Sequence, residues 1–179
     1  TGFTQVKGTT LKNGLTIQDS TGNQYVWVEV PKAERVYKTA GLEIKDFTDE
    51  EYTKIEDDLH TYTDVYRDGT SYKDEYYSGV GLTSEEYYSL KKMMLKSVYQ
   101  NGGFYIGKYE TGIEDAPKTS GSANVAPTET PVIKQNAYPY NFVTCKQAQT
   151  LASNMESGNH TSSLMFGVQW DLVLKYLET

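Results

Sequence analysis

Cysteine and histidine are scarce in this chain of 179 residues, and each scarcity excludes a class of chemistry. Cys145 is the single cysteine, so an internal disulfide, a CxxC redox pair and a thiolate zinc cage cannot form. His60 and His160 stand far apart in the sequence, so the helical HExxH zinc motif is absent. We therefore expect no cofactor. For Cys145 we expect a small buried apolar side chain, with a reactive thiol beside a helix N-terminus as the alternative.

Aliphatic residues are also few. Leu, Ile, Val and Phe together make up about a fifth of the chain, which is close to the range of disordered proteins. Sixteen tyrosines and two tryptophans compensate, because their rings supply apolar area while their polar tips find partners. No apolar run approaches the length of a membrane span and no signal peptide opens the chain, so we expect no membrane insertion.

Basic residues are outnumbered, with 17 Lys and Arg against 24 Asp and Glu, a net charge of −7 and a pI near 4.9. A surface of this sign disfavours nucleic acid as a partner. The acidic excess is concentrated between residues 43 and 86, where 14 acidic and four basic residues give a net charge of −10. Such a block indicates a solvated or inserted segment, because like charges at this density repel one another.

A calcium loop is the functional alternative for part of this block. Residues 64–75 match the EF-hand pattern at Asp64, Asp68, Gly69 and Glu75. Tyrosines occupy two of the alternating ligand positions, however, so the pattern is weak and calcium binding stays an open question.

Regular elements are indicated by turn and capping signals along the chain. Residues 15–18 and 24–30 flank a Gly-containing turn and predict a β-hairpin. Capping boxes at Thr48, Thr83 and Thr144 predict three helices, ending near residues 59, 101 and 155.

Further elements complete this prediction. Residues 104–110 predict a strand, and residues 162–166 a short strand or extended piece. A final helix from about residue 167 is expected to bury Trp170, Val173, Leu174 and Leu177 on one face.

Three motifs in order resemble one protein family. They are Phe104–Thr111 (FYIGKYET), Pro139–Thr144 (PYNFVT) running into a helix, and Ser163–Trp170 (SLMFGVQW). Together they resemble the domain of formylglycine-generating enzymes, the sulfatase-modifying factor family. The resemblance implies an α+β, C-type-lectin-like mixed fold, here its N-terminal part, with a β-hairpin, several short strands and three to four helices. The upstream hairpin is closer to the non-enzymatic bacterial and prophage surface proteins of this family.

The departures from the enzymes point to binding without catalysis. The second half of the family's domain, which carries a catalytic cysteine pair, has no counterpart here, and Cys145 does not stand in the catalytic pattern. We therefore expect a non-catalytic binding or display domain that recognises a protein or glycan. The resemblance implies an extracellular location, on a bacterial cell surface or a phage tail. The first alternative is a structural spacer, and the second, less favoured, is an enzyme remnant.

The expected organisation is an entry segment over residues 1–14 and one incomplete domain over residues 15–179. Within that domain we expect an acidic, tyrosine-rich insertion at about 43–80 and a Pro-rich loop at about 114–134. Tyrosines cluster in the insertion, and exposed tyrosines offer rigid amphipathic area to a ligand. The candidate ligand contacts are Tyr66, Tyr72, Tyr76 and Tyr77. Packing of the same tyrosines into an aliphatic-poor core is the alternative.

Overall fold

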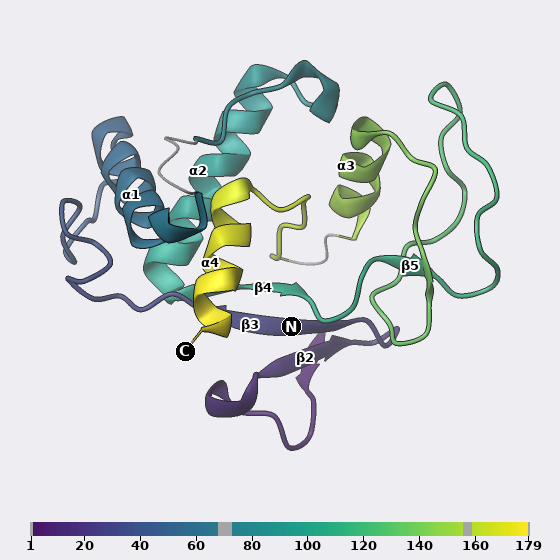
Figure 1. The fold of residues 1–179 in the computed structure, drawn as a ribbon, viewed down its shortest axis with the longest axis horizontal. Helices are drawn as coiled ribbons and strands as arrows, with labels where there is room; N and C mark the ends of the chain where they lie inside the picture. The colour runs from purple at the N-terminus through teal and green to yellow at the C-terminus, as the bar shows by residue number, and fades with distance from the viewer. Residues whose placement is uncertain (1, 68–72, 156–158, 179) are drawn as a thin grey trace. The chain divides into compact units, whose positions relative to one another are not determined.

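The computed structural model describes residues 2–67, 73–155 and 159–178 and has an α+β fold (Figure 1). The chain divides into two compact units. The first unit contains residues 1–27, 78–82 and 105–164, and the second contains residues 28–77, 83–104 and 165–179.

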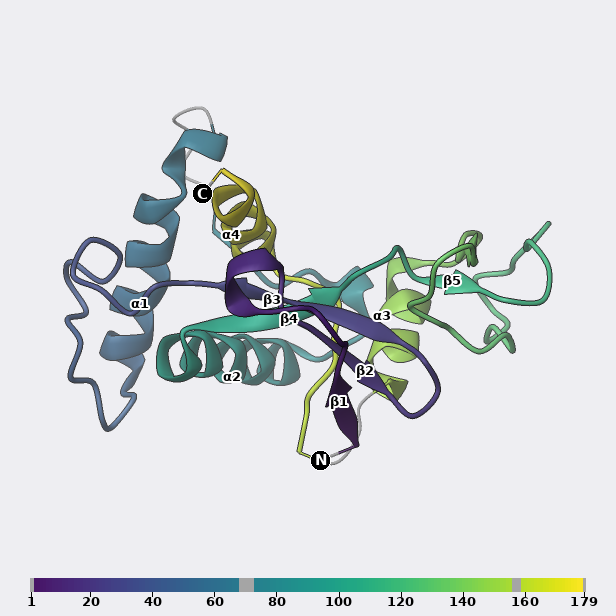
Figure 2. The same cartoon turned by 90° about the horizontal axis from the view of Figure 1, so that it is seen from below.

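The predicted hairpin lies within a four-stranded sheet. Its strands are, in order, β1 (Phe3–Gln5), β2 (Thr16–Asp19), β3 (Gln24–Glu29) and β4 (Gly103–Gly107). Strands β2 (Thr16–Asp19) and β3 (Gln24–Glu29) pair antiparallel, which confirms the hairpin. Its turn is closed by the Asp19 carboxylate, which accepts from the backbone N–H groups of Thr21 and Asn23 at 2.9 and 3.0 Å. The entry segment is more structured than expected, because β1 (Phe3–Gln5) adds to β2 as a further antiparallel strand (Figure 2).

The strands and the helix that follow residue 102 frame a long loop. Strand β4 (Gly103–Gly107) is followed by a two-stranded sheet of β5 (Gly112–Ile113) and β6 (Tyr138–Pro139), and then by helix α3 (Cys145–Asn154). The chain between β5 and β6 runs out as an extended excursion in both ribbon views (Figures 1 and 2). Short 3-10 turns are η1 (Leu11–Asn13) and η3 (Ser78–Val80).

Helices build the second unit: α1 (Asp49–Tyr62), α2 (Ser84–Asn101) and α4 (Gly167–Leu177), with a 3-10 turn η2 (Asp64–Arg67). All three predicted capping boxes, those of α1, α2 and α3, are present. Helix α2 ends at Gly102, whose φ of 74° is the left-handed conformation that glycine adopts without strain. The core of this unit includes Ile55, Leu59, Leu95, Val98, Tyr99, Val168 and Leu172.

Tyrosines do supply part of this core. Tyr37 and Tyr99 are each 1% exposed or less, and their rings meet edge to face at 4.8 Å. The Tyr99 hydroxyl donates to the Gly41 carbonyl at 2.9 Å and accepts from the Ile44 N–H at 3.2 Å. A polar tip that is paired in this way lets a large ring be buried without losing a hydrogen bond.

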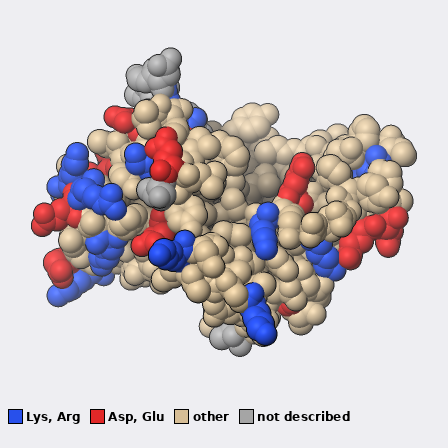
Figure 3. All heavy atoms as spheres, turned by 60° about the horizontal axis from the view of Figure 1, so that its bottom comes forward, with Lys and Arg blue, Asp and Glu red and all other residues tan. Residues whose placement is uncertain are grey.

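The acidic segment is only partly a surface feature. Helix α1 turns most of its carboxylates outward but buries Ile55 and Leu59 completely. Asp58 is also buried, because its carboxylate accepts from the backbone N–H groups of Thr39 and Ala40 at 2.9 and 2.8 Å. On the face drawn in Figure 3, acidic and basic side chains lie in small mixed groups rather than in one field of single sign.

The expected burial of two α4 residues is wrong, because Trp170 is 52% exposed and Leu177 is 73% exposed. Of the two forms predicted for residues 162–166, a strand is not formed. Val168 and Leu172 are buried positions of α4. Each is two residues from Trp170, which is about 200° around the helix, so Trp170 lies on the opposite side. Asp171 is also on the buried side of α4, where it accepts from Arg67 Nε at 2.6 Å. Among the described residues, no helix has the length and apolar character needed to cross a membrane.

Candidate functional site

The predicted ligand-contact tyrosines lie in the second unit but do not share one environment. Tyr77 is 67% exposed, whereas Tyr76 is half-buried with its ring 5.9 Å from that of Tyr87. Tyr66 is also half-buried, and burial together with the nearby Glu178 carboxylate raises its pKa to about 12. Tyr72 lies outside the described residues. Of the tyrosines that the structure describes in this group, Tyr77 offers the largest exposed fraction to a ligand.

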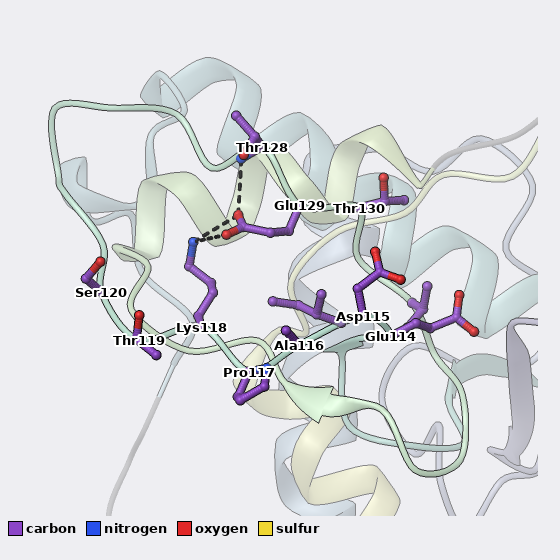
Figure 4. Close-up of a pocket in the computed structure, with 12 residues that line it drawn as sticks. Glu114, Asp115, Ala116, Pro117, Lys118, Thr119, Ser120, Thr128, Glu129 and Thr130 are labelled. Atoms are coloured by element: carbon purple, nitrogen blue, oxygen red, sulfur yellow. Dashed lines mark hydrogen bonds and ion pairs between the residues drawn. The ribbon is translucent and has the colours of Figure 1, made fainter.

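A hollow in the first unit is a candidate site. Its volume is about 480 Å³, within the range of roughly 300–1,000 Å³ typical of small-ligand pockets. Two stretches of the predicted Pro-rich loop form its walls, residues 113–120 and residues 128–132 (Figure 4). We call this hollow the loop pocket. Loops presented on a regular scaffold are a common position for binding residues.

An ion pair joins the two walls of the loop pocket. Lys118 Nζ lies 2.9 Å from both carboxylate oxygens of Glu129, and Figure 4 shows the two side chains pointing toward each other. The Lys118 side chain is only 8% exposed, and its ammonium also lies 5.7 Å from the ring centroid of Tyr140. The hydrogen bond from Lys118 is the main cause that lowers the pKa of Glu129. The Glu129 carboxyl group is therefore ionised at neutral pH.

Further contacts hold the loop against the regular elements of the first unit. Gln147, in the first turn of α3, donates through Nε2 to the carbonyls of Ser122 and Val125 at 2.7 and 2.8 Å. The Tyr140 hydroxyl donates to the Glu129 carbonyl at 2.8 Å, and Val132 pairs with Gly112 in a β-bridge. The excursion thus has fixed partners on α3 and beside β5 and β6.

The groups that remain available in the loop pocket are hydroxyls and one carboxylate. Asp115 is exposed and has no ion pair or hydrogen bond within the described part of the chain. In Figure 4 its carboxylate points toward the wall that carries Thr130. The hydroxyl-bearing lining residues are Thr119, Ser120, Thr128 and Thr130. This arrangement can accept and donate hydrogen bonds.

A second group of ionisable side chains is buried in the second unit. Potential ligand atoms of Glu56, His60 and Asp74 lie within 4.8 Å of one another, as in a metal site. Lys91 already places a positive charge there, because its Nζ lies 2.9 Å from Glu56 Oε1 and donates to the Asp74 carbonyl at 2.9 Å. The Asp74 carboxylate accepts from the Gly167 N–H at 2.6 Å. We interpret this group as a tie between helices α1, α2 and α4.

Two further predictions concern Cys145 and the EF-hand-like stretch. Cys145 is exposed at the first position of α3, so the expected burial is wrong. The buried residues of α3 are Gln147 and Gln149, which bond to neighbouring segments, and this orientation leaves the first helical position in solvent. The EF-hand-like stretch 64–75 includes residues outside the described ranges, and its ends, Asp64 and Glu75, are both exposed.

Comparison of the chain with protein-family models, with curated proteins and with solved structures found no match.

The loop pocket was not predicted from the sequence. The Pro-rich composition of residues 114–134 indicated an exposed loop but not its closure by Lys118 and Glu129, which are 11 residues apart. Of the residues that hold the loop, Gln147 was recognised in the sequence, as part of a capping box. Its hydrogen bond to the loop depends on tertiary structure and was not predicted.

Proposed function

We propose that the chain is a non-catalytic binding domain that recognises a protein or glycan ligand. The loop pocket is the observation that carries this proposal. A polar hollow built on loops with fixed partners offers a preorganised surface, which reduces the entropy lost on binding. Tyr66, Tyr72, Tyr76 and Tyr77 stay a prediction for a second contact surface.

The chemistry of the chain favours binding over catalysis. One cysteine is too few for the cysteine pair of the enzymes that the sequence resembles. In the loop pocket, Glu129 has a lowered pKa and is bound to Lys118, the opposite of the raised pKa that a general acid needs.

The fold and location are proposed on the same basis. A C-type-lectin-like arrangement agrees with an α+β fold that combines an antiparallel hairpin with helices and long loops. We propose that the chain belongs to a larger protein of a bacterial cell surface or a phage tail. This placement is supported by the resemblance of residues 104–111, 139–144 and 163–170 to surface proteins of the formylglycine-generating-enzyme family.

Binding of fluorescently labelled chain to intact bacterial and epithelial cells, measured by flow cytometry, tests this function. We expect saturable binding that unlabelled chain displaces. A Tyr77→Ser variant tests the predicted tyrosine contacts, with Tyr88→Ser on α2 as the matched control, since Tyr88 is 39% exposed in the same unit. Absence of saturable binding on every surface tried contradicts the proposal.

A further inference from the structure

Phe142 contacts the chain next to the loop pocket, at Gly121, and has a conformation that a phenylalanine rarely adopts. Its φ is 54°, in the left-handed region, and it is 52% exposed. It contacts Gly121, the residue after the lining residue Ser120. A Cβ atom at Gly121 would lie 2.0 Å from the Phe142 carbonyl oxygen and 2.9 Å from its Cβ. The backbone of an exposed aromatic residue is therefore in contact with the residue that follows Ser120 of the pocket lining.

The hollow itself presents groups that suit a polyhydroxylated ligand. Threonine and serine hydroxyls both donate and accept, and a carboxylate accepts two hydroxyl donors at once. Asp115 provides such a carboxylate, free of partners among the described residues, on the wall opposite the one that carries Thr130. An aromatic ring near these groups adds an apolar face against which C–H groups pack.

We propose that the loop pocket, together with Phe142, is a binding site for a neutral carbohydrate. This inference rests on the proposed binding function and specifies the ligand class. Asp115 accepts hydrogen bonds from neighbouring sugar hydroxyls, the threonine and serine hydroxyls complete the polar contacts, and the Phe142 ring covers one face of the sugar.

The charges of the site favour a neutral sugar over an acidic one. Asp115, Glu114 and Glu129 all carry carboxylates in the lining, and a uronic or sialic acid would add a like charge at close range. The basic group in the lining, Lys118, is already paired with Glu129. Lys134, which lies nearby, is paired with Glu114 at 3.0 Å.

The polarity of the hollow also favours a sugar over a protein partner. Centres of protein–protein interfaces are depleted in charged residues and enriched in aromatic ones. The lining of the loop pocket instead combines three carboxylates, one ammonium and four hydroxyls.

An array of immobilised oligosaccharides, with neutral members beside sialylated and uronic-acid-containing ones, tests this site. We expect the wild-type chain to bind neutral members in preference to acidic ones. Asp115→Asn and Phe142→Ser are each expected to weaken that binding at least tenfold, whereas Asp46→Asn, a change of an exposed aspartate in the second unit, leaves it unchanged. Thermal unfolding of each variant checks that it is folded, and Asp115→Asn preserves the shape of an exposed side chain.

The outcomes separate this inference from the proposed function. Glycan binding that Asp115→Asn and Phe142→Ser leave intact but Tyr77→Ser removes overturns the loop-pocket site and retains the binding function. Preference for acidic glycans overturns the proposed ligand class. Binding to cells without binding to any glycan on the array indicates a protein ligand and overturns the carbohydrate inference alone.

Discussion

Phe47 and Phe142 have nearly the same left-handed backbone, with φ angles of 53° and 54°, but Phe47 is 8% exposed and Phe142 is 52% exposed. Phe47 precedes the N-cap of α1, and its ring lies 5.7 Å from that of Tyr52 and 5.8 Å from that of Tyr99. The strain at Phe47 is thus offset by burial in a hydrophobic staple. Phe142 has the same backbone strain without comparable burial.

Glycine substitution at these two positions is expected to have unequal effects. Phe142→Gly should change the free energy of unfolding by no more than about 1 kcal/mol, because relief of the left-handed strain offsets the greater entropy of the unfolded chain. Phe47→Gly should cost about 2–4 kcal/mol, since emptying the core outweighs the same relief. Urea unfolding measures both, and equal losses would mean that Phe142 also builds the core.

Substitutions in α4 test which face of the helix is buried. Trp170 is 52% exposed and Leu172 is 1% exposed. Trp170→Ala should therefore cost under about 1 kcal/mol, whereas Leu172→Ala should cost about 2–5 kcal/mol. Chemical denaturation followed by circular dichroism distinguishes them, and the reverse order would show that α4 is rotated from the orientation described.

Acid should destabilise the second unit through Glu56. Burial raises the pKa of Glu56, but hydrogen bonds with His60 and Lys91 and the charge of Lys91 outweigh burial and hold this pKa below its usual value of 4.5. A carboxyl group with a lowered folded-state pKa stabilises the protein above the unfolded-state pKa, and this contribution is lost as the pH falls through the folded-state value. Stability should therefore decline below about pH 4.5.

A pair of variants isolates this effect. Between pH 7 and pH 3, the melting temperature of Glu56→Gln should fall less than that of the wild type. Glu34→Gln, at an exposed position of the same unit, should follow the wild type. Parallel curves for the wild type and Glu56→Gln would remove Glu56 from the explanation of acid sensitivity.

We expect the Cys145 thiol to react with an alkylating reagent but not to take part in catalysis. Cys145 is exposed, so one equivalent of maleimide should label the folded chain. A single cysteine does not provide the pair used in formylglycine formation, so no oxidation of a CxPxR-type peptide is expected with added copper. Turnover that Cys145→Ser abolishes would contradict this.

Local signals predicted the secondary structure well, because each depends on residues near one another in the chain. Thr48, Thr83 and Thr144 each cap a helix that begins where expected, and the turn at Asp19 closes the predicted hairpin. Which face of a helix is buried depends on tertiary contacts, and local patterns did not predict it for α4. Trp170 shares helical spacing with apolar residues, but α4 buries Val168, Leu172 and Asp171, which accepts from Arg67, 104 residues away, and Trp170 is exposed.

The same limit applies to the candidate site. The composition of residues 114–134 predicted a loop, but the pairing of Lys118 with Glu129 and the contact of Gly121 with Phe142 depend on how the loop folds back. The tyrosine cluster was visible as a count of residues, while the separation of exposed Tyr77 from half-buried Tyr66 and Tyr76 required the structure.

The most direct test of binding without catalysis is an NMR titration of the isotope-labelled chain with a neutral oligosaccharide selected on the array. We predict that backbone amide shifts change in a saturable manner, that the largest changes fall in residues 113–120, 128–132 and 142, and that the oligosaccharide spectrum is the same after prolonged incubation. Conversion of the oligosaccharide into a new species would contradict the absence of catalysis, and amide shifts that do not change at any ligand concentration would contradict binding.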